Sequence, residues 1–221
     1  MMVQSLDVLI TGGTGYVGRQ LITELLARGH RVRALARPSS VHRVPLGASV
    51  VAGDPLDADS VTAAVKPGDS IVHLVGTPHP SPAKAKEFQQ VDLPSIRATV
   101  TAAQRVKVFH LIYVSVAQPA PVMRAYLEVR AAGEAMIREA QLTATILRPW
   151  YILGPGHRWP VVLLPIYKIM ELLPSTHASA QRLGLVTIHQ MVQALVRAVE
   201  DPPTQDTIRT VDVPGFRSAS Q

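Results

Sequence analysis

The sequence predicts a doubly wound α/β fold, in which a parallel sheet carries helices on both faces. Three observations lead to this prediction. A glycine-rich segment follows the first apolar run almost at the start of the chain. Short apolar segments then alternate with segments of helical periodicity, which is the pattern of a parallel sheet with helical crossovers. The chain has 221 residues and no internal repeat, and this length suits a single domain with a sizeable core.

The glycine-rich segment lies between an expected strand, Leu6–Ile10, and an expected helix, Tyr16–Arg28. This order of strand, glycine-rich turn and helix distinguishes a dinucleotide-binding turn from a simple loop. Gly12 permits the tight turn, Gly15 lets the backbone approach a pyrophosphate, and Gly18 lets the helix pack closely against the strand. The free N–H groups at the start of the helix attract the phosphates. The alternative is a loop that needs glycine only for positive φ angles.

Each further element follows from the same alternation of apolar runs and helical patterns. The other strands are expected at Arg31–Ala36, Ser49–Ala52, Ser70–Val75, Val108–Val114, Ala144–Leu147, Leu183–Ile188 and Thr207–Val213. The other helices are expected at Ala58–Val65, Ala83–Arg105, around Tyr126–Glu134, and Gln190–Glu200. Pro94 is expected to kink or split the second of these, because proline removes a helical hydrogen bond. Asp57 and His189 are the expected N-terminal caps of two helices.

These elements make one domain, residues 1–221. Residues 1–150 form the dinucleotide-binding core, and residues 151–221 form a small cap on the substrate side that returns a late strand to the sheet. The unusually apolar stretch Trp159–Pro174 lies in this cap. For this stretch we rank packing in the core first, the wall of a substrate pocket second and peripheral contact with a membrane third. Its prolines and charges argue against a bilayer span.

The end of the second strand indicates which dinucleotide is bound. No acidic residue occurs between Gly29 and Gly53, although a site for NAD usually places one there to bind the ribose 2′-hydroxyl. Arg37 follows the strand instead, with Ser39, Ser40 and Arg43 nearby. A guanidinium suits a 2′-phosphate, so the sequence predicts NADP rather than NAD. The alternative is an arginine that is simply exposed to solvent.

Residues 11–18, Thr-Gly-Gly-Thr-Gly-Tyr-Val-Gly, resemble the glycine-rich turn of the short-chain dehydrogenase/reductase superfamily. The segment looks most like the atypical branch, which includes NmrA-like proteins and relatives of a complex I accessory subunit. Residues 147–156 are similar to that branch's segment Leu-Arg-Pro-x-x-Ile-x-Gly-Pro-Gly. The resemblance implies a Rossmann-type fold. It also implies cofactor-binding roles for Thr11, Gly12, Thr14, Gly15, Tyr16, Val17, Gly18, Arg37, Ser39, Asp54, Pro55, Val75, Gly76, Pro149 and Trp150.

Several of these residues have a particular place in the resemblance. Asp54 would lie beside the adenine amino group, although Pro55 interrupts the usual order there. Gly76 would let the chain pass under the pyrophosphate and the nicotinamide ribose. Backbone groups after Pro149 would meet the nicotinamide carboxamide, and Trp150 would either wall the ring or pack at a rigid corner.

The candidate catalytic residues are Ser115, Tyr126 and Arg130. Tyr126 and Arg130 have the spacing of the superfamily's Tyr-x-x-x-Lys motif, with arginine in place of lysine, and Glu134 continues the match. The two side chains would lie on one face of a helix. The resemblance implies that Tyr126 is the general acid and that the charge of Arg130 favours its phenolate. It also implies that Ser115 donates a hydrogen bond to a substrate carbonyl oxygen.

The sequence leaves two functions open. The first is an oxidoreductase that transfers hydride between NADPH and a small, apolar carbonyl or quinone-like substrate. The second is a non-catalytic NADP-binding regulator or assembly factor. Arg130 favours the second, because arginine keeps its proton and cannot join the relay that a lysine can join. Asp92 stands where the family more often has asparagine, and the sequence assigns it no role.

Composition narrows the remaining possibilities. The chain has no cysteine, so it has neither disulfides nor thiolate chemistry, and its eight histidines show no metal-binding spacing. Its net charge is +6, but the arginines are scattered, so nucleic acid is not an expected partner. No secretory leader and no transmembrane segment are expected. The predicted location is the cytoplasm.

Overall fold

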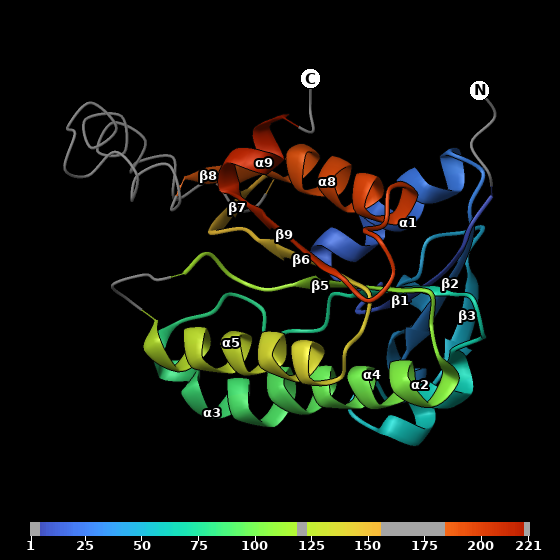
Figure 1. Cartoon of the computed structure of the whole chain (residues 1–221), viewed down its shortest axis with the longest axis horizontal. Coiled ribbons are helices and arrows are strands. Elements are labelled where there is room, and N and C mark those ends of the chain that lie inside the picture. The colour runs from blue at the N-terminus through green and yellow to red at the C-terminus, as the bar shows by residue number, and fades with distance from the viewer. Residues whose placement is uncertain (1–4, 119–122, 156–183, 219–221) are drawn as a thin grey trace.

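A seven-stranded parallel sheet forms the centre of the computed structural model, which describes residues 5–118, 123–155 and 184–218 (Figure 1). The strand order is β3-β2-β1-β4-β5-β6-β9. The strands are β1 Asp7–Thr11, β2 Arg31–Ala36, β3 Ser49–Ala52, β4 Ser70–His73, β5 His110–Val114, β6 Ala144–Arg148 and β9 Ile208–Asp212. All neighbouring strands run parallel, which confirms the predicted doubly wound α/β fold.

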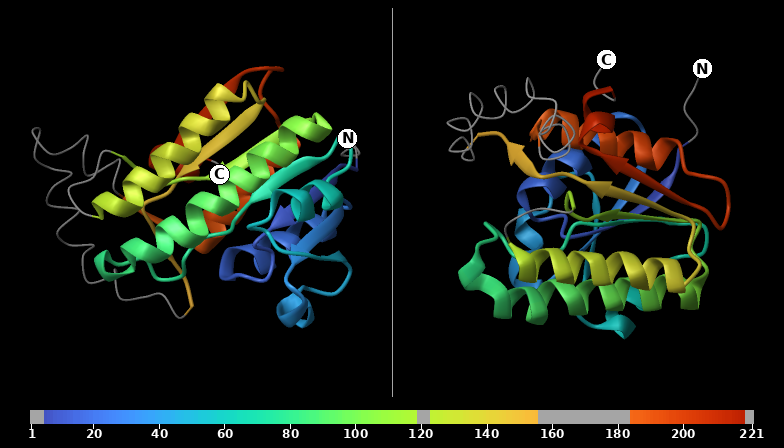
Figure 2. Two further views of the ribbon diagram at one scale, coloured as in Figure 1. Left: turned by 90° about the horizontal axis from the view of Figure 1, so that it is seen from below. Right: turned by 60° about the vertical axis from the view of Figure 1, so that its left-hand side comes forward.

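Helices cover both faces of the sheet (Figures 1 and 2). One layer consists of α1 Tyr16–Ala27, α8 Ile188–Glu200 and α9 Val213–Ser218, and the other of α2 Ala58–Ala64, α4 Leu93–Val106 and α5 Arg124–Glu139. The shorter segments are η1 Pro38–Arg43, η2 Pro82–Lys84, α3 Ala85–Glu87 and a π-helical turn, η3 Phe88–Asp92. A separate pair of parallel strands consists of β7 Tyr151–Leu153 and β8 Leu185–Thr187.

The hydrophobic core lies in two halves, one on each side of the sheet. Successive residues of a strand point to opposite faces, so Val8 and Ile10 of β1 pack with α1 and α8, while Leu9 packs with the helices of the other layer. All three are fully buried. This burial on both faces explains why β1 is a continuous apolar run from Val8 to Ile10.

The order of the strands determines where a ligand can bind. The chain proceeds from β1 through β2 to β3 in one direction across the sheet, then resumes at β4 beside β1 and proceeds in the other direction. The loops that follow β1 and β4 therefore diverge and leave a crevice at the carboxyl ends of these strands. The glycine-rich turn follows β1 and lies at this crevice.

The glycines of this turn are required by close backbone contacts. Gly12 has a φ of +77°, and a Cβ there would lie 2.6 Å from the carbonyl carbon of Leu74. A Cβ on Gly18 would lie 2.5 Å from the carbonyl oxygen of Gly12, where backbone cannot move aside. The predicted tight turn at Gly12 and close packing at Gly18 are thus confirmed.

Three of the elements expected from the sequence can be compared directly with the structure. The helix expected at 83–105 is divided into η2, α3, η3 and α4, and Pro94 lies in the first turn of α4, so the predicted division is confirmed. Within the described part of the strand expected at 183–188, residues 185–187 form β8. Asp57 caps α2 as predicted, since its Oδ2 accepts a hydrogen bond from the N–H of Ser60 (2.8 Å).

The prediction that His189 caps α8 is wrong. Thr187 is the cap, and its hydroxyl oxygen accepts a hydrogen bond from the N–H of Gln190 (3.1 Å). The side chain of Gln190 accepts one in return from the N–H of Thr187 (2.9 Å). His189 lies exposed in the first turn of the helix. A threonine followed three residues later by glutamine satisfies two backbone donors, which a single histidine cannot do.

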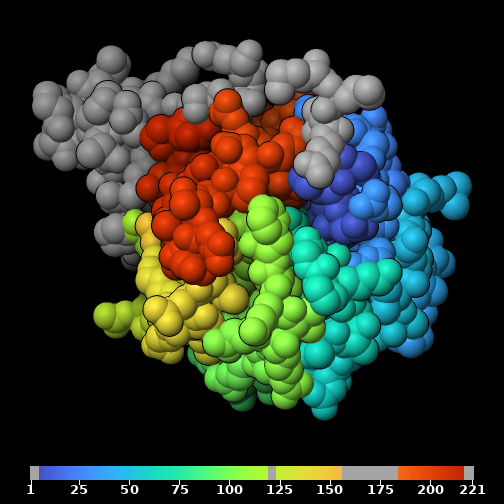
Figure 3. All heavy atoms as spheres, turned by 45° about the vertical axis from the view of Figure 1, so that its right-hand side comes forward, coloured from blue at the N-terminus to red at the C-terminus, as the bar shows by residue number. Residues whose placement is uncertain are grey.

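The C-terminal elements return to the start of the chain. In the space-filling view the orange and red C-terminal surface lies against the blue N-terminal surface, because α8 packs beside α1 (Figure 3). Arg28 and Glu200 join the ends of these helices in an ion pair (3.2 Å). None of the helices in the described ranges is long and apolar enough to cross a bilayer. The stretch 159–174 lies outside these ranges.

Candidate functional site

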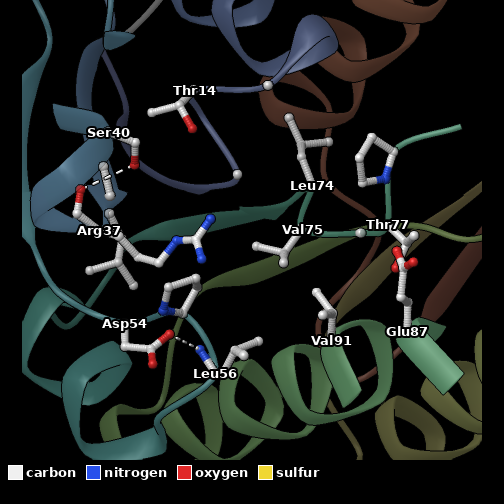
Figure 4. Close-up of a pocket in the computed structure, with 17 residues that line it drawn as sticks. Thr14, Arg37, Ser40, Asp54, Leu56, Leu74, Val75, Thr77, Glu87 and Val91 are labelled. Carbon is white, nitrogen blue, oxygen red and sulfur yellow. Dashed lines mark hydrogen bonds between the residues drawn. The ribbon is translucent and has the colours of Figure 1, made fainter. Parts of the chain in front are cut away.

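A cavity of ≈ 310 Å³ opens at the carboxyl ends of β1, β2 and β4, and we call it the glycine-loop cavity (Figure 4). It is lined by Gly12, Thr14, Gly15, Leu35, Ala36, Arg37, Ser40, Asp54, Pro55, Leu56, Leu74, Val75, Gly76, Thr77, Pro78, Glu87 and Val91. Arg37 and Asp54 lie at one end in Figure 4, and Thr77 and Glu87 lie at the other. The cavity is therefore elongated across the glycine-rich turn.

Arg37 supplies a positive charge to one end of this cavity. It directly follows β2, and its guanidinium extends into the cavity (Figure 4). Within residues 5–118, 123–155 and 184–218 it forms no ion pair with a carboxylate. The hydroxyl of Ser40 donates a hydrogen bond to the Arg37 carbonyl oxygen (3.1 Å), and Ser40 lines the cavity whereas Ser39 does not.

Asp54 lies beside Arg37, in the loop that follows β3. One of its oxygens, Oδ1, accepts a hydrogen bond from the N–H of Leu56 (3.0 Å). Its own N–H donates to the hydroxyl oxygen of Ser60 (2.8 Å). These bonds fix the loop, so Asp54 and Pro55 are held at the cavity wall without needing a ligand.

A second cavity of ≈ 340 Å³ adjoins the first, and we call it the aromatic cavity. It is lined by Tyr16, Val17, Thr77, Pro78, His79, Pro80, Val114, Ser115, Val116, Tyr126, Pro149, Trp150, Tyr151 and Ile152. Trp150 and Tyr151 meet edge to face, with ring centroids 5.4 Å apart. Thr77 and Pro78 line both cavities, so these two residues form a shared wall between them.

The predicted catalytic residues lie in or near the aromatic cavity. Tyr126 lines the cavity and packs against Phe88, with ring centroids 5.0 Å apart. Arg130 is buried and lies outside the lining of both cavities. Its guanidinium lies across two tyrosine rings, 5.1 Å from the ring centroid of Tyr126 and 5.8 Å from that of Tyr113. The role of Arg130 as the electrostatic partner of Tyr126 stays a prediction.

Arg130 also forms an ion pair with Asp92. Arg130 Nη2 donates a hydrogen bond to Asp92 Oδ1 (2.7 Å), and Nη1 donates to the carbonyl oxygen of Val114 (3.0 Å). Burial opposes the charge, but Tyr126, Tyr113 and Asp92 around it raise the pKa of Arg130 above its ordinary value. Helical spacing places Arg130 on the same face as Tyr126, but it does not reveal a partner thirty-eight residues away.

Asp92 connects this ion pair to the shared wall. Its second oxygen, Oδ2, accepts hydrogen bonds from the N–H of Thr77 (2.9 Å) and from the Thr77 hydroxyl (2.6 Å). Gly76 makes this approach possible, since a Cβ there would overlap Arg130 Nη2. The sequence assigned no role to Asp92. The only feature that pointed to this residue was its position, where the family more often has asparagine.

Ser115 lines the aromatic cavity, but its hydroxyl is directed to Glu134. Ser115 Oγ donates a hydrogen bond to Glu134 Oε1 (2.7 Å). Glu134 also accepts hydrogen bonds from Arg148 (2.8 and 2.5 Å) and Arg138 (2.9 Å). Burial raises the pKa of Glu134, but the hydrogen bonds from Arg148, Ser115 and Arg138 outweigh it and lower that pKa. Spacing alone could not predict this cluster.

Thr11 lies beneath the glycine-rich turn, with its side chain directed into the core. Its hydroxyl lies 3.0 Å from Nδ1 of His73, which also lies 2.9 Å from the hydroxyl of Thr99. Burial, together with the charge of Arg130, lowers the pKa of His73 to about 3, so this histidine is neutral. Thr11 therefore anchors the turn from below.

The two cavities contain most of the predicted cofactor-binding residues. The glycine-loop cavity includes Gly12, Thr14, Gly15, Arg37, Asp54, Pro55, Val75 and Gly76, and the aromatic cavity includes Tyr16, Val17, Pro149 and Trp150. Thr11, Gly18 and Ser39 lie outside both linings. The main residues that sequence reasoning missed are Thr77 and Pro78, although the glycine before them marks the loop.

Known proteins are similar to this chain in both sequence and fold. The ceramide reductase of Caulobacter vibrioides is 29% identical over 198 residues, covering 88% of this chain and 61% of that protein. The photosystem II assembly factor Ycf39 of Cyanophora paradoxa is 27% identical over 150 residues, covering 65% and 44%. A short-chain dehydrogenase/reductase superfamily protein from Agrobacterium tumefaciens, solved with bound NAD, has a TM-score of 0.67 at 18% identity, covering 93% and 77%.

The chain spans less than two thirds of the length of these two relatives. The family described as NAD(P)H-binding matches residues 12–160, which is more than half of the chain. That range contains the glycine-rich turn, β7 and every residue that lines the two cavities. The chain therefore belongs to the NAD(P)H-binding family, with the fold of the short-chain dehydrogenase/reductase superfamily.

Proposed function

We propose that this protein is an NADP(H)-dependent oxidoreductase that reduces a small, apolar carbonyl or quinone-like substrate. The observation that carries the proposal is the position of Tyr126, a potential proton donor, in a cavity that shares a wall with the glycine-loop cavity. Two adjoining cavities suit a reaction that joins a dinucleotide to a second molecule. The chain is also similar to a ceramide reductase.

The glycine-loop cavity fits a dinucleotide with a 2′-phosphate. The backbone positions at Gly12 and Gly15 leave room that a Cβ would fill, and the N-terminus of α1 begins there. Arg37 and Ser40 lie at the end of β2, where the adenosine ribose is held in this fold. Since Arg37 has no carboxylate partner in the described ranges, its charge is available to a phosphate.

The aromatic cavity suits the chemistry of carbonyl reduction. When bound, NADPH would supply the hydride to the carbonyl carbon. Tyr126 would donate its hydroxyl proton to the carbonyl oxygen and recover a proton from solvent. Trp150, Tyr151 and Ile152 provide flat and apolar walls, which favour an uncharged substrate and exclude water.

The alternative is an NADP-binding regulator or assembly factor of the NmrA-like kind. Ser115 favours this alternative, because its proton is donated to Glu134. Arg130 favours it as well, because its guanidinium already forms an ion pair with Asp92. The chain is also similar to a photosystem II assembly factor. The cytoplasmic location and the lack of a nucleic-acid partner stay predictions.

The cofactor preference is tested with Arg37→Ala. Removing a charge-assisted hydrogen bond to a phosphate costs about 1.5–3 kcal/mol, so NADPH binding should weaken roughly 10- to 100-fold, while NADH binding changes little. The measurement is calorimetric titration of both nucleotides. Arg43→Ala is the matched control, because Arg43 is an exposed arginine of η1 outside both linings. Equal weakening of NADPH and NADH would remove the NADP assignment.

The choice between enzyme and regulator is tested with Tyr126→Phe. If Tyr126 is the proton donor, NADPH oxidation with aldehydes and quinones should fall by about 10²-fold or more. The dissociation constant for NADPH should stay the same, because the phenol ring and its packing on Phe88 are kept. If the wild-type protein binds NADPH tightly but turns over none of these substrates, the regulator becomes the preferred function.

A further inference from the structure

We infer that Asp92 and Arg130 form a positioning pair that holds the shared wall, and through it the nicotinamide end of the dinucleotide. This inference rests on the proposed function. It differs from the sequence prediction, which gave Arg130 a direct part in the reaction and gave Asp92 none. The pair lies beneath both cavities, lines neither, and would act through Thr77.

The geometry of Asp92 carries the first step. Its two carboxylate oxygens serve two different partners, with Oδ1 accepting from Arg130 and Oδ2 accepting twice from Thr77. Asp92 is 2% exposed and Arg130 is 6% exposed, so neither charge is compensated by water. A buried carboxylate that is tied to a loop on one side and to a cation on the other can hold that loop in one position.

The place of Thr77 in the cavities carries the second step. In Figure 4, Thr77 lies at the end of the glycine-loop cavity opposite Arg37 and Asp54. If Arg37 receives the 2′-phosphate of the adenosine, the nicotinamide half must extend toward Thr77 and the aromatic cavity. Displacement of Thr77 would therefore affect the nicotinamide half and leave the adenosine half in place.

The local structure of the helix carries the third step. Asp92 ends the π-helical turn η3 immediately before α4, and its carbonyl oxygen accepts a hydrogen bond from the hydroxyl of Ser95 (2.8 Å). Phe88 begins the same turn and packs against Tyr126. The turn that fixes Asp92 thus also fixes the ring of the proposed proton donor, and π-helical turns are frequent at functional sites.

The experiment compares two ligands in Asp92→Asn. Asparagine has one acceptor oxygen and one NH₂ donor, so it cannot accept from both Arg130 and Thr77, and one of the two sides must be lost. NADPH binding should weaken about tenfold, because the loop that holds its nicotinamide end loses its support. Adenosine 2′,5′-bisphosphate lacks the nicotinamide half and reaches only the Arg37 end, so its affinity should stay within about twofold. Both affinities are measured by calorimetry.

Further variants make the test decisive. Thr77→Val removes one hydrogen bond while keeping the shape of the side chain. It should also weaken NADPH binding more than bisphosphate binding, but by a smaller factor than Asp92→Asn does. The double variant should be no worse than Asp92→Asn alone, because both changes act on the same contact. Asp59→Asn is the matched control, since Asp59 is an exposed carboxylate that pairs with Arg105 on the surface.

The possible outcomes separate the inference from the proposed function. A selective loss of NADPH affinity supports the positioning pair. An equal loss for both ligands means that the pair only stabilises the fold, and no loss for either means that the wall does not depend on it; each result overturns the inference. Should Asp92→Asn fail to fold, the two affinities of Thr77→Val distinguish the same outcomes. If the wild-type protein binds neither ligand, the proposed function falls and the inference falls with it.

Discussion

His110 is a fully buried histidine at the start of β5, on the face of the sheet that packs against α8. Its Nε2 lies 3.0 Å from the hydroxyl of Thr145, while its Nδ1 is buried without a hydrogen-bond partner in the described part of the chain. Burial, together with the charge of Arg209, lowers the pKa of His110 to about 4. A histidine in this state makes the stability of the protein depend on pH.

Whether stability rises or falls with pH follows from the pKa of His110 in the unfolded and the folded protein. The unfolded chain takes up a proton on His110 near pH 6.5, whereas the folded protein takes it up only near pH 4, so stability is lost as the pH falls through this window. His110→Gln keeps an acceptor or donor for Thr145 but cannot titrate. The loss of unfolding free energy between pH 7 and pH 4 should therefore shrink by up to about 3 kcal/mol.

Urea unfolding at the two pH values measures this change. His42→Gln is the matched control for replacing a histidine by glutamine, because His42 is exposed on η1. His110→Gln should still lose stability as the pH falls, but less than the wild type does, because the pKa of His73 is lowered as well. An unchanged decline in His110→Gln would show that His110 takes up its proton at the same pH in both states.

The capping of α8 leads to a prediction about a whole element. Thr187 and Gln190 satisfy each other's backbone donors at the start of this helix, and the helix buries Met191, Leu195 and Val199 in the core. Thr187→Ala should therefore reduce the free energy of unfolding by about 1 kcal/mol. His189→Ala should change it by less than about 0.5 kcal/mol, because His189 is exposed and caps nothing. Urea denaturation measures both, and a larger effect at His189 than at Thr187 would contradict this assignment of the cap.

The elements that could be predicted from the sequence are those whose burial leaves a periodic pattern. β1, β2 and β3 agree with their predicted positions within one residue at either end, because apolar runs between turn residues mark them directly. α9 was missed, because its Pro214 and Gly215 argue against a helix. Val213 and Phe216 are fully buried there, so packing overrides the local preference.

The candidate site could be predicted only in part, for a related reason. The roles of Gly12 and Gly18 follow from backbone geometry that a short sequence pattern determines. The partners of Arg130 and Ser115 lie in other elements, so their direction depends on tertiary structure that spacing does not reveal. The sequence thus located residues near the site, but it could not predict that Arg130 pairs with Asp92 or that Ser115 donates to Glu134.

At the scale of the whole molecule, the site results from the change of direction in the sheet. β1 lies between β2 and β4, and the loops that follow these three strands enclose the glycine-loop cavity. β5 and β6 continue the sheet, and residues that directly follow these two strands line the aromatic cavity. One sheet thus supports both cavities, and each cavity is formed mainly by loops that the strands hold in place.

The shared wall limits how such a protein can diverge. A change at Trp150 alters only the aromatic cavity, and a change at Arg37 alters only the glycine-loop cavity, so each can be selected for one property at a time. A change at Thr77 or Pro78 alters both together and has to be acceptable for both. Descendants of this chain are therefore free to acquire new substrates through the outer residues of the aromatic cavity, whereas the two wall residues should be inherited with little variation.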